Sequence, residues 1–547
     1  MSRVAAGTNK QSTTWPHPPP SHPPAAMFRF PLPPAPPVLQ AGIWASALLL
    51  SGGCNAASLK AAALHWQVPP PPPVSAAAPV LWVALAAQLQ PPTPLRLRSA
   101  TGNLRLETSR GERFAAPEFL LQWRSVPLAE PLTLRRQVWG PFASHESAEE
   151  AAARWRQAGA EVVIAHPAEW EVWAALEAPV PAGVTPRRLE QVQRQRLALE
   201  LRRPGRGAVL LEGPLRLEAP GGLRWQGGVF AGPFRLQGDA YGSWTLVEEV
   251  PLERYLLGVV PHEIGAGAPP AALAAQAVLA RTWALRNQGR FAVDGYHLCA
   301  DTQCQVYADP RQAGPAVRRA IGVTRHQVLA WQGAPIHGVY HATNGGISAG
   351  FEEVWSGSAL PYLRPWVDGP GAIQAKVTLP LEPAGVAAAL AATSRAYGFD
   401  HPRFRWTRLL DGAQIQRALA KTAPQLGTPT RLTVLERGPS GRVLALAIEA
   451  RGPAGEPQSV VLRRDAIRRN LRQLPSTLFV LRQEGSGRWR FDGGGFGHGA
   501  GLSQAGAIDL ARRGWSLAQI LGHYYPGTSL EPLVALPRDP GSAAGSP

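Results

Sequence analysis

Glu263 is the side chain in this sequence with the clearest capacity for acid–base chemistry. It lies in a glycine-rich loop ahead of an expected helix that Pro270 opens at its first turn. Val260, Ile264 and Trp283 are expected to wall this loop with apolar surface. A carboxyl group withdrawn from water keeps its proton to higher pH, so Glu263 is predicted to act as a general acid near neutral pH.

The same segment also has a purely structural interpretation. Pro261 interrupts an apolar run at residues 255–260, and the chain then turns towards the helix. In this interpretation Glu263 caps that helix or forms an ion pair with Arg281, as loop glutamates routinely do. Taken alone, the segment favours the structural role.

Polar side chains suited to contact with a ligand occur in three stretches. The stretch HGVYHATNGG at residues 337–346 ends in glycines that would let a ligand approach the backbone. The expected helix and the glycine-rich stretch at residues 493–506 add further candidates. The predicted substrate contacts are His341, Thr343, Asn344, Gln276, His498 and Gln504. Because His337, Val339 and His341 alternate along an expected strand, a structural role suits these histidines equally well.

The glycine-rich stretch GGGFGHGAGLSQAG, residues 493–506, has two further interpretations. It lacks the lysine and the strand-to-helix context of a nucleotide-binding loop, so nucleotide binding is rejected. In a second interpretation Ser503 is a nucleophile and His498 is its base. The sequence does not favour it, because it shows neither a G-x-S-x-G turn nor an acidic residue positioned to orient the histidine. A helix from about Ser503 to Gly514 is predicted instead.

Strand-like and helical patterns alternate around these residues and predict an α+β fold. Residues 136–139 and 161–165 read as strands that flank a helix with Ser147 and Glu150 at capping-box spacing, ended by Gly159. Short strands separated by glycines are expected over residues 207–250. Residues 431–448 are predicted to form a hairpin around a Pro-Ser-Gly turn.

The first residues and the overall charge limit the function classes. Residues 41–50 (AGIWASALLL) follow Arg29 and precede small residues, which is typical of a signal peptide and predicts an exported, periplasmic or cell-envelope protein. Cys54 is a minority candidate for a lipid anchor, the only membrane attachment expected besides the leader. The net charge of +17 rests on scattered arginines without a basic stripe, so no nucleic-acid partner is expected.

Four stretches resemble successive motifs of the SpoIID/LytB family, in that family's order. They are VPLERYLLGVVPHE, AALAAQAVLARTWAL, YHATNGGISAGFEEVWSGSALPYLR and GFGHGAGLSQAGAIDLARRGWSLAQILGHYYPGT, all within residues 207–530. The resemblance implies a peptidoglycan lytic transglycosylase or an enhancer of a cell-wall amidase, with Glu263 as the catalytic acid/base. Ile264 stands where the family commonly has methionine, and the insert GAGAPP lengthens the loop that follows.

The implied chemistry requires one carboxyl group. A lytic transglycosylase protonates the bridging glycosidic oxygen, and the sugar's own 6-hydroxyl then attacks, so one residue serves as acid and later as base. A hydrolase would require a second carboxylate. The candidates for it have no telling spacing and are Asp301, Glu352, Glu353 and Asp492.

Cys299 and Cys304 form a C-x4-C pair, which in an exported protein suits a disulfide or half of a metal site. The resemblance offers a structural zinc as the alternative to a disulfide here, with His297 as a candidate third ligand and His337 or His341 as a candidate fourth; free thiols are the third alternative. Gln303 occupies the position of the family's histidine before the second cysteine, so the disulfide is preferred. No cofactor is required by the expected chemistry.

The expected organisation has five parts. Residues 1–57 are a leader, 58–78 a Pro/Ala-rich linker, 79–200 a SPOR-like domain, 205–535 the SpoIID/LytB domain and 536–547 a disordered tail. The segments GPFAS and AEEAAARWRQAG resemble SPOR domains, a family that binds glycan strands without stem peptides. The expected partners are therefore peptidoglycan glycan strands and, in the enhancer interpretation, a cell-wall amidase.

Overall fold

Antiparallel strands form most of the first half of the structure. The computed structural model describes residues 63–203 and 207–533. The signal-like segment at residues 41–50, Cys54 and the tail from residue 536 lie outside the described residues. Within the described ranges, no helix is both long enough and apolar enough to cross a bilayer.

The first sheet joins strands from both sides of the expected domain boundary near residue 204. Its order is β15-β1-β14-β13-β10-β3-β4. Its strands are β1 (Val80–Leu89), β3 (Leu104–Glu107), β4 (Arg113–Ala116), β10 (Leu215–Glu218), β13 (Phe234–Gly238), β14 (Trp244–Pro251) and β15 (Leu298–Cys299). Since β1 pairs with β14 along most of its length, sheet pairing crosses the expected boundary, and the division itself stays a prediction.

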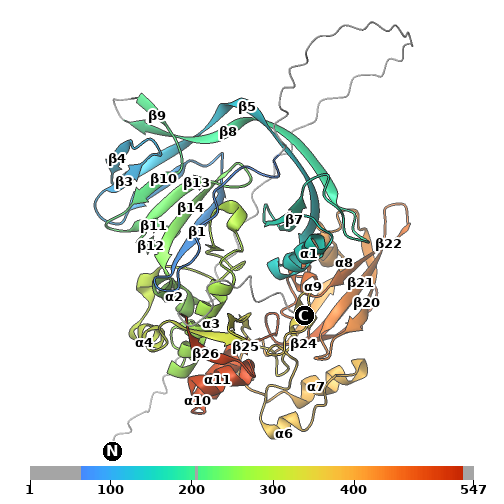
Figure 1. The fold of residues 1–547 in the computed structure, drawn as a ribbon. Helices are drawn as coiled ribbons and strands as arrows, with labels where there is room; N and C mark the ends of the chain where they lie inside the picture. The colour runs from blue at the N-terminus through green and yellow to red at the C-terminus, as the bar shows by residue number, and fades with distance from the viewer. Residues whose placement is uncertain (1–62, 204–206, 534–547) are drawn as a thin grey trace, which may run out of the picture. The chain divides into compact units, whose positions relative to one another are not determined.

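The second sheet carries the order β12-β11-β2-β5-β7-β6, with β8 paired to β5 and β9 to β8. Its strands are β2 (Leu95–Ser99), β5 (Glu118–Phe142), β6 (Val162–Ala165), β7 (Trp170–Ala174), β8 (Arg187–Arg203), β9 (Gly207–Leu211), β11 (Leu223–Trp225) and β12 (Gly228–Phe230). The long strands β5 and β8 curve side by side (Figure 1). In β2 the leucines are buried and the arginines exposed, the period-2 pattern of a strand with one face on the core.

The expected strand–helix–strand unit is present as β5, α1 (His145–Gln157) and β6. The sequence placed the cap wrongly: Ser144, not Ser147, is the N-cap, and its hydroxyl accepts a hydrogen bond from the Ser147 amide at 3.3 Å. The helix begins three residues earlier because Ser144 is the residue with extended backbone. Its apolar face buries Trp155 against the second sheet, as predicted.

A helical layer positions Glu263. It contains α2 (Leu252–Val260), the π-helical turn η1 (Pro261–Gly265), α3 (Pro270–Arg286), α4 (Pro315–Val323), α10 (Gln504–Arg512) and α11 (Leu517–Tyr524). Helix α3 packs against α2, α4, α10 and α11. Residues 272–285 are buried throughout, since the small alanines of α3 let neighbouring helices approach on several sides.

The sequence predicts that the chain leaves the helix at Pro261, and this prediction is wrong. The chain continues directly from α2 into η1, with Pro261 at φ −68°. Proline supplies no backbone donor for a normal α-helical bond, but its fixed φ is compatible with helical winding, so the chain passes into a wider turn. Glu263 therefore lies on a helical turn instead of a loop.

The remaining elements form small sheets and short helices. The small sheets contain β16 (Gln327–Trp331), β17 (Ala334–Pro335) and β26 (Ser529–Pro532); β18 (Tyr340–His341) and β25 (Leu502–Ser503); β19 (Arg405–Asp411), β23 (Phe479–Gln483) and β24 (Arg488–Gly494); and β20 (Thr428–Arg437), β21 (Val443–Arg451) and β22 (Pro457–Arg463). The short helices are η2 (Ala292–Asp294), η3 (Pro310–Gln312), α5 (Phe351–Val354), α6 (Gly371–Gln374), η4 (Pro383–Gly385), α7 (Val386–Ala392), α8 (Gly412–Leu419) and α9 (Asp465–Asn470).

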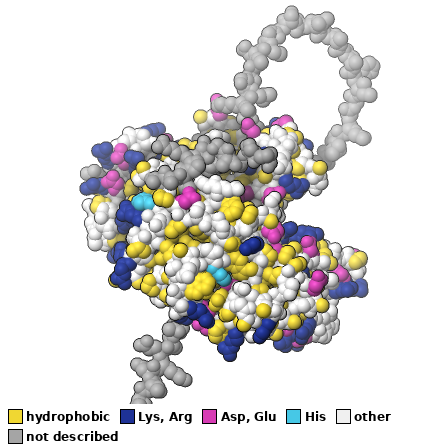
Figure 2. All heavy atoms as spheres, turned by 60° about the horizontal axis from the view of Figure 1, so that its bottom comes forward, with side chains coloured by type: hydrophobic (Ala, Val, Ile, Leu, Met, Phe, Trp, Pro, Cys, Tyr) yellow, Lys and Arg dark blue, Asp and Glu magenta, His cyan; other side chains and the backbone are white. Residues whose placement is uncertain are grey.

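These elements confirm the predicted α+β class. The hairpin of β20 and β21, the short strands over residues 207–250 and the helix after Ser503 also lie where the sequence predicts them. On the face shown in Figure 2, Lys and Arg side chains are interspersed with acidic and apolar ones, as the scattered arginines of the sequence indicate.

Candidate active site

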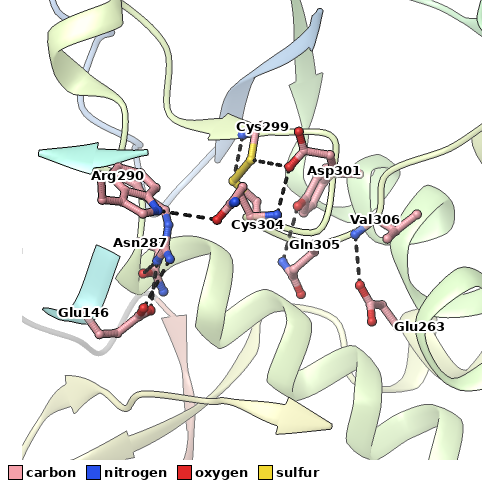
Figure 3. Close-up of a disulfide and its surroundings, with 12 residues drawn as sticks. Glu146, Glu263, Asn287, Arg290, Cys299, Asp301, Cys304, Gln305 and Val306 are labelled. Atoms are coloured by element: carbon pink, nitrogen blue, oxygen red, sulfur yellow. Dashed lines mark hydrogen bonds and ion pairs between the residues drawn. A yellow bond between two sulfur atoms is a disulfide. The ribbon is translucent and has the colours of Figure 1, made fainter. Parts of the chain in front are cut away.

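Glu263 projects from η1 into a cavity of about 250 Å³. Its Oε1 atom accepts a hydrogen bond of 2.9 Å from the backbone amide of Val306 (Figure 3). Burial raises the pKa of this carboxyl to about 7, against the opposing effects of the Val306 amide and the Tyr340 hydroxyl. At neutral pH Glu263 is thus divided between its acid and its carboxylate, as a general acid/base requires.

Aromatic side chains from distant parts of the chain wall this Glu263 cavity. Trp283 of α3 lines it, as predicted, and Trp355 follows α5. Val260 and Ile264, the other expected walls, are buried in the main core instead. Val260 ends α2 and Ile264 lies in η1, and both side chains are buried in the core. The prediction that they surround the carboxyl group assumed a loop at this position.

The structural interpretation of Glu263 is wrong in both its forms. Arg281 donates two hydrogen bonds to Glu253, at 2.9 and 2.7 Å, and is fully buried in that pair. No side chain caps the N-terminus of α3 within the described residues. Glu263 is therefore held by the amide of Val306, 43 residues along the chain.

Other carboxylates that line the cavity are already engaged. Glu353 accepts hydrogen bonds from the Gly350 and Ser440 amides at 2.7 and 2.8 Å. Glu146 forms an ion pair of 3.1 Å with Arg290. Burial raises the pKa of Asp465 to about 6, and the Ser147 hydroxyl donates to it at 3.4 Å.

The remaining second-carboxylate candidates do not belong to the site. The described residues that line the cavity do not include Asp301, Glu352 or Asp492. Asp301 accepts from the Gln303 amide at 2.8 Å, and Asp492 binds Thr407 at 2.7 Å and Arg490 at 2.9 Å. A hydrolase that uses one of these three with Glu263 is not supported by the geometry.

His498 lines the cavity, as predicted, but both of its ring nitrogens are occupied. The Ala500 amide donates to Nδ1 at 3.2 Å, so Nε2 carries the proton and donates to the Tyr340 carbonyl at 2.9 Å. Burial, with the charge of Arg468, lowers the pKa of His498 to about 3. The Ser503 hydroxyl caps α10 by accepting from the Gly506 amide, so the serine-nucleophile interpretation is wrong.

The other five predicted substrate contacts are buried and lie outside the described lining of the cavity. Gln504 of α10 donates to Gln276 of α3 at 3.2 Å, which joins two packed helices. Asn344 donates to Asp368 at 2.7 Å, and Thr343 accepts from the Gly345 amide at 3.3 Å. His341 lies beneath His498, with ring centroids 5.0 Å apart. Their polar atoms make contacts inside the protein, and direct contact with a substrate in this cavity is not supported by the geometry.

The cysteine pair is a disulfide, the preferred prediction, so the two sulfurs are not a pair of metal ligands. His297, the expected third ligand, accepts from the Trp82 amide at 2.8 Å through Nδ1 and contacts the Pro72 carbonyl at 2.9 Å through Nε2. His337 contacts Arg286 at 3.0 Å. The described part of the chain contains no cluster of three side chains suited to a metal ion.

Sequence reasoning missed a group of arginines on the cavity wall. Arg464, Arg468 and Arg469 come from α9 and the residue before it, and Arg290 follows α3. The signal was present in the run RRDAIRRN at residues 463–470, whose arginines recur at helical spacing. The many scattered arginines of the whole chain make this local spacing hard to distinguish in the sequence.

Comparison with known proteins agrees with these motifs. A family model described as "Stage II sporulation protein" matches residues 240–331, which include Glu263 and both cysteines of the disulfide. A second model, a domain of unknown function (DUF8618), matches residues 349–501 and so includes α9 and His498. Together these two segments supply most walls of the Glu263 cavity.

Curated relatives match about half of the chain. Stage II sporulation protein D of Bacillus amyloliquefaciens is 29% identical over 300 residues, 52% of this chain and 75% of the relative. The protein of the same name from Bacillus subtilis (strain 168) is 26% identical with the same coverage. An amidase enhancer of Bacillus subtilis (strain 168) is 27% identical over 50% of this chain and 40% of its own length. The order of motifs, the family model and these relatives support the assignment of this chain to the SpoIID/LytB family.

Proposed function

We propose that this chain is an exported cell-envelope protein that cleaves peptidoglycan glycan strands as a lytic transglycosylase, with Glu263 as acid and base. Its family and relatives support a role related to the cell wall. The observation that carries the enzymatic proposal is a carboxyl group with a pKa of about 7 that lines a cavity. The Cys299–Cys304 disulfide is typical of exported proteins and supports the compartment.

The proposed reaction proceeds through one carboxyl group. Protonated Glu263 donates its proton to the glycosidic oxygen, and the C1–O bond breaks with its electron pair leaving on that oxygen. The 6-hydroxyl of the same sugar forms the new bond to C1, and its proton passes to the Glu263 carboxylate. The Val306 amide stabilises the carboxylate between these two transfers. Water is not consumed, so an anhydro sugar end forms.

A non-catalytic enhancer of a cell-wall amidase is the second candidate. It is favoured by the relative named amidase enhancer, which is 27% identical to this chain. In that case the cavity would bind glycan without breaking it. The fold and the wall partner are common to both candidates, so only product analysis separates them.

The decisive experiment is digestion of purified stem-peptide-free glycan by wild type, Glu263→Gln and Asp465→Asn. Asp465 is the matched control because it lines the same cavity and burial also raises its pKa. We expect 1,6-anhydro ends from wild type and Asp465→Asn, and a loss of at least about 100-fold for Glu263→Gln, the lower range of general acid catalysis. Activity retained by Glu263→Gln, or abolished only by Asp465→Asn, would contradict the assignment; inactive wild type would favour the enhancer.

A further inference from the structure

Arg468 is a partly buried guanidinium without a protein partner. It lines the Glu263 cavity, and no hydrogen bond or ion pair joins it to an acceptor among the described residues. Burial and the neighbouring charge of Arg469 lower its pKa to about 10, while Asp465 acts in the opposite direction. A buried cation is normally paired, since withdrawing its charge from water costs several kcal/mol. The unmet charge points to an anionic ligand.

The adjoining arginines are held in place by the protein. Arg464 adopts φ +48°, a backbone conformation that side chains other than glycine rarely adopt, and its Nε donates to the Glu352 carbonyl at 2.9 Å. Arg469 donates to Gln303 at 3.4 Å. The two fix the wall on either side of Arg468, so its guanidinium is the one left for a ligand.

The acidic groups of the cavity do not neutralise this wall. Glu146 is paired with Arg290, and Glu353 faces the buried Arg442. Glu263 is divided between its neutral and charged forms near pH 7. Asp465 is the remaining acidic group among the described residues that line the cavity, and it supplies at most one negative charge against the three arginines at positions 464, 468 and 469. The α9 side of the cavity carries net positive charge.

We propose that Arg464, Arg468 and Arg469 form a carboxylate-binding subsite, which takes the lactyl carboxylate of a muramoyl residue in stem-peptide-free glycan. This inference rests on the proposed function. The lactyl group is the only anionic group of an unsubstituted N-acetylmuramoyl–N-acetylglucosamine repeat. In peptide-bearing strands it is an amide and has no charge. Arginine binds carboxylates through parallel N–H donors, so the wall would favour glycan from which the peptide has been removed.

Binding measurements test the subsite separately from cleavage. Full-length protein carrying Glu263→Gln is titrated with three glycan preparations: stem-peptide-free strands, the same strands with carboxylates converted to methyl amides, and strands that retain stem peptides. Arg468→Gln is then added to that background. The matched control is Arg463→Gln, which removes an exposed arginine of the same run, 3.4 Å from Glu436.

We expect Arg468→Gln to weaken binding of stem-peptide-free strands about tenfold or more, as for a lost charged hydrogen bond. Arg463→Gln should change it less than about twofold, as a pair on the surface would. Strands with amidated carboxylates should bind equally weakly to the protein with Arg468 and to the protein with Arg468→Gln. Thermal unfolding checks that each variant folds. If Arg468→Gln does not fold, Arg469→Gln tests the same group of arginines.

Two outcomes would overturn the subsite. One is equal binding of free and amidated strands; the other is an Arg468 effect confined to peptide-bearing strands, which would assign the wall to a stem-peptide carboxylate. Failure of the proposed function looks different. Cleavage retained by Glu263→Gln, or absent from wild type, removes the enzymatic role, while a carboxylate-dependent loss of binding would still identify the anionic subsite.

Discussion

Burial of Glu263 against a single amide donor gives this carboxyl group its raised pKa, and this predicts a pH profile. The acid form is needed for the first proton transfer, so the rate of glycan cleavage should fall as pH rises through about 7. Initial rates of anhydro-end formation between pH 5 and 9 measure this. A rate that rises with pH across the same range would contradict a protonated Glu263.

The same pKa has a consequence for stability. The folded pKa is about 7 and the ordinary value is 4.5, so the folded state holds the proton more tightly. This contribution is fully present below pH 4.5 and is lost as pH rises to about 7. Glu263→Gln should therefore raise the free energy of unfolding at pH 8 by up to about 3 kcal/mol, and by little at pH 4. Denaturant unfolding at both pH values provides the comparison, and a pH-independent difference would argue against the shift.

Prediction from sequence succeeded for single residues whose role depends on local sequence and failed for those set by distant contacts. The disulfide of Cys299 with Cys304 is predictable from a short motif. Glu263 lines the cavity, and its catalytic role stays a prediction. Asn344 was assigned to substrate because its polarity is visible in the sequence. Its buried hydrogen bond to Asp368, 24 residues away in the chain, is not visible in the sequence.

At the scale of elements, the disulfide closes the loop that holds Glu263. Cys299 and Cys304 are five positions apart, and Figure 3 shows their disulfide together with the bond from Val306 to Glu263. Residues 302–306 line the cavity. Replacing both cysteines by serine should lower the free energy of unfolding by about 2 kcal/mol, since the short loop gains freedom in the unfolded chain. It should also move the pH midpoint of activity upward, because the Val306 amide that lowers the Glu263 pKa is held less firmly.

The control for this change is Cys54→Ser, which removes the third cysteine of the chain and leaves the pair intact. That variant should match wild type in unfolding and in pH midpoint. Reduction of wild type with a dithiol should reproduce the double variant. An unchanged midpoint in both would show that the loop keeps the Val306 amide in place without the disulfide.

Helices were predictable where a proline or glycine marks their ends. Pro270 begins α3, and Gly159 follows α1. The helical turn at Pro261 was not predictable from the sequence. Proline removes a backbone hydrogen-bond donor but also fits helical φ, and the sequence does not indicate which effect dominates. Whether such a residue ends a helix depends on the tertiary packing around it.

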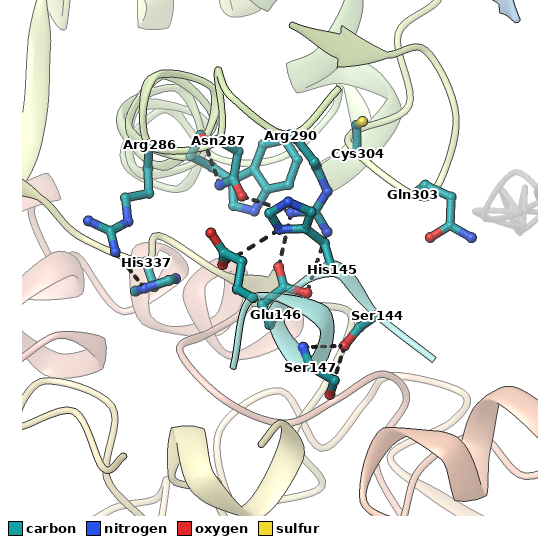
Figure 4. Close-up of polar contacts among 12 residues, drawn as sticks. Ser144, His145, Glu146, Ser147, Arg286, Asn287, Arg290, Gln303, Cys304 and His337 are labelled. Atoms are coloured by element: carbon teal, nitrogen blue, oxygen red, sulfur yellow. Dashed lines mark hydrogen bonds and ion pairs between the residues drawn. The ribbon is translucent and has the colours of Figure 1, made fainter. Parts of the chain in front are cut away.

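For the whole molecule, a contact between α1 and the segment after α3 links the unit of β5, α1 and β6 to the wall of the Glu263 cavity. Glu146 and Arg290 are both buried and pair at 3.1 Å (Figure 4). Glu146→Gln leaves the Arg290 charge without its partner, so we expect the free energy of unfolding to fall by about 3 kcal/mol. Denaturant unfolding at pH 7 measures the loss.

The pH dependence of that loss is a second test. Burial acts to raise the pKa of Glu146, but the charge of Arg290 outweighs it and lowers the pKa to about 2. The pair's contribution is present above pH 4.5 and decreases as pH falls towards 2, so wild type and variant should converge there. Glu107→Gln, which removes an exposed pair with Arg113, is the control and should cost less than about 1 kcal/mol.

The pairing of β1 with β14 determines where this protein can be divided. A fragment that begins after residue 206 keeps every recognised family motif but leaves the backbone groups of β14 unpaired along one side. Exposed strand edges of this kind recruit other chains. Dissection of the molecule for crystallography or domain exchange therefore has to follow its hydrogen bonds, which tie residues 80–89 to the later segment, and not the apparent junction in the primary sequence.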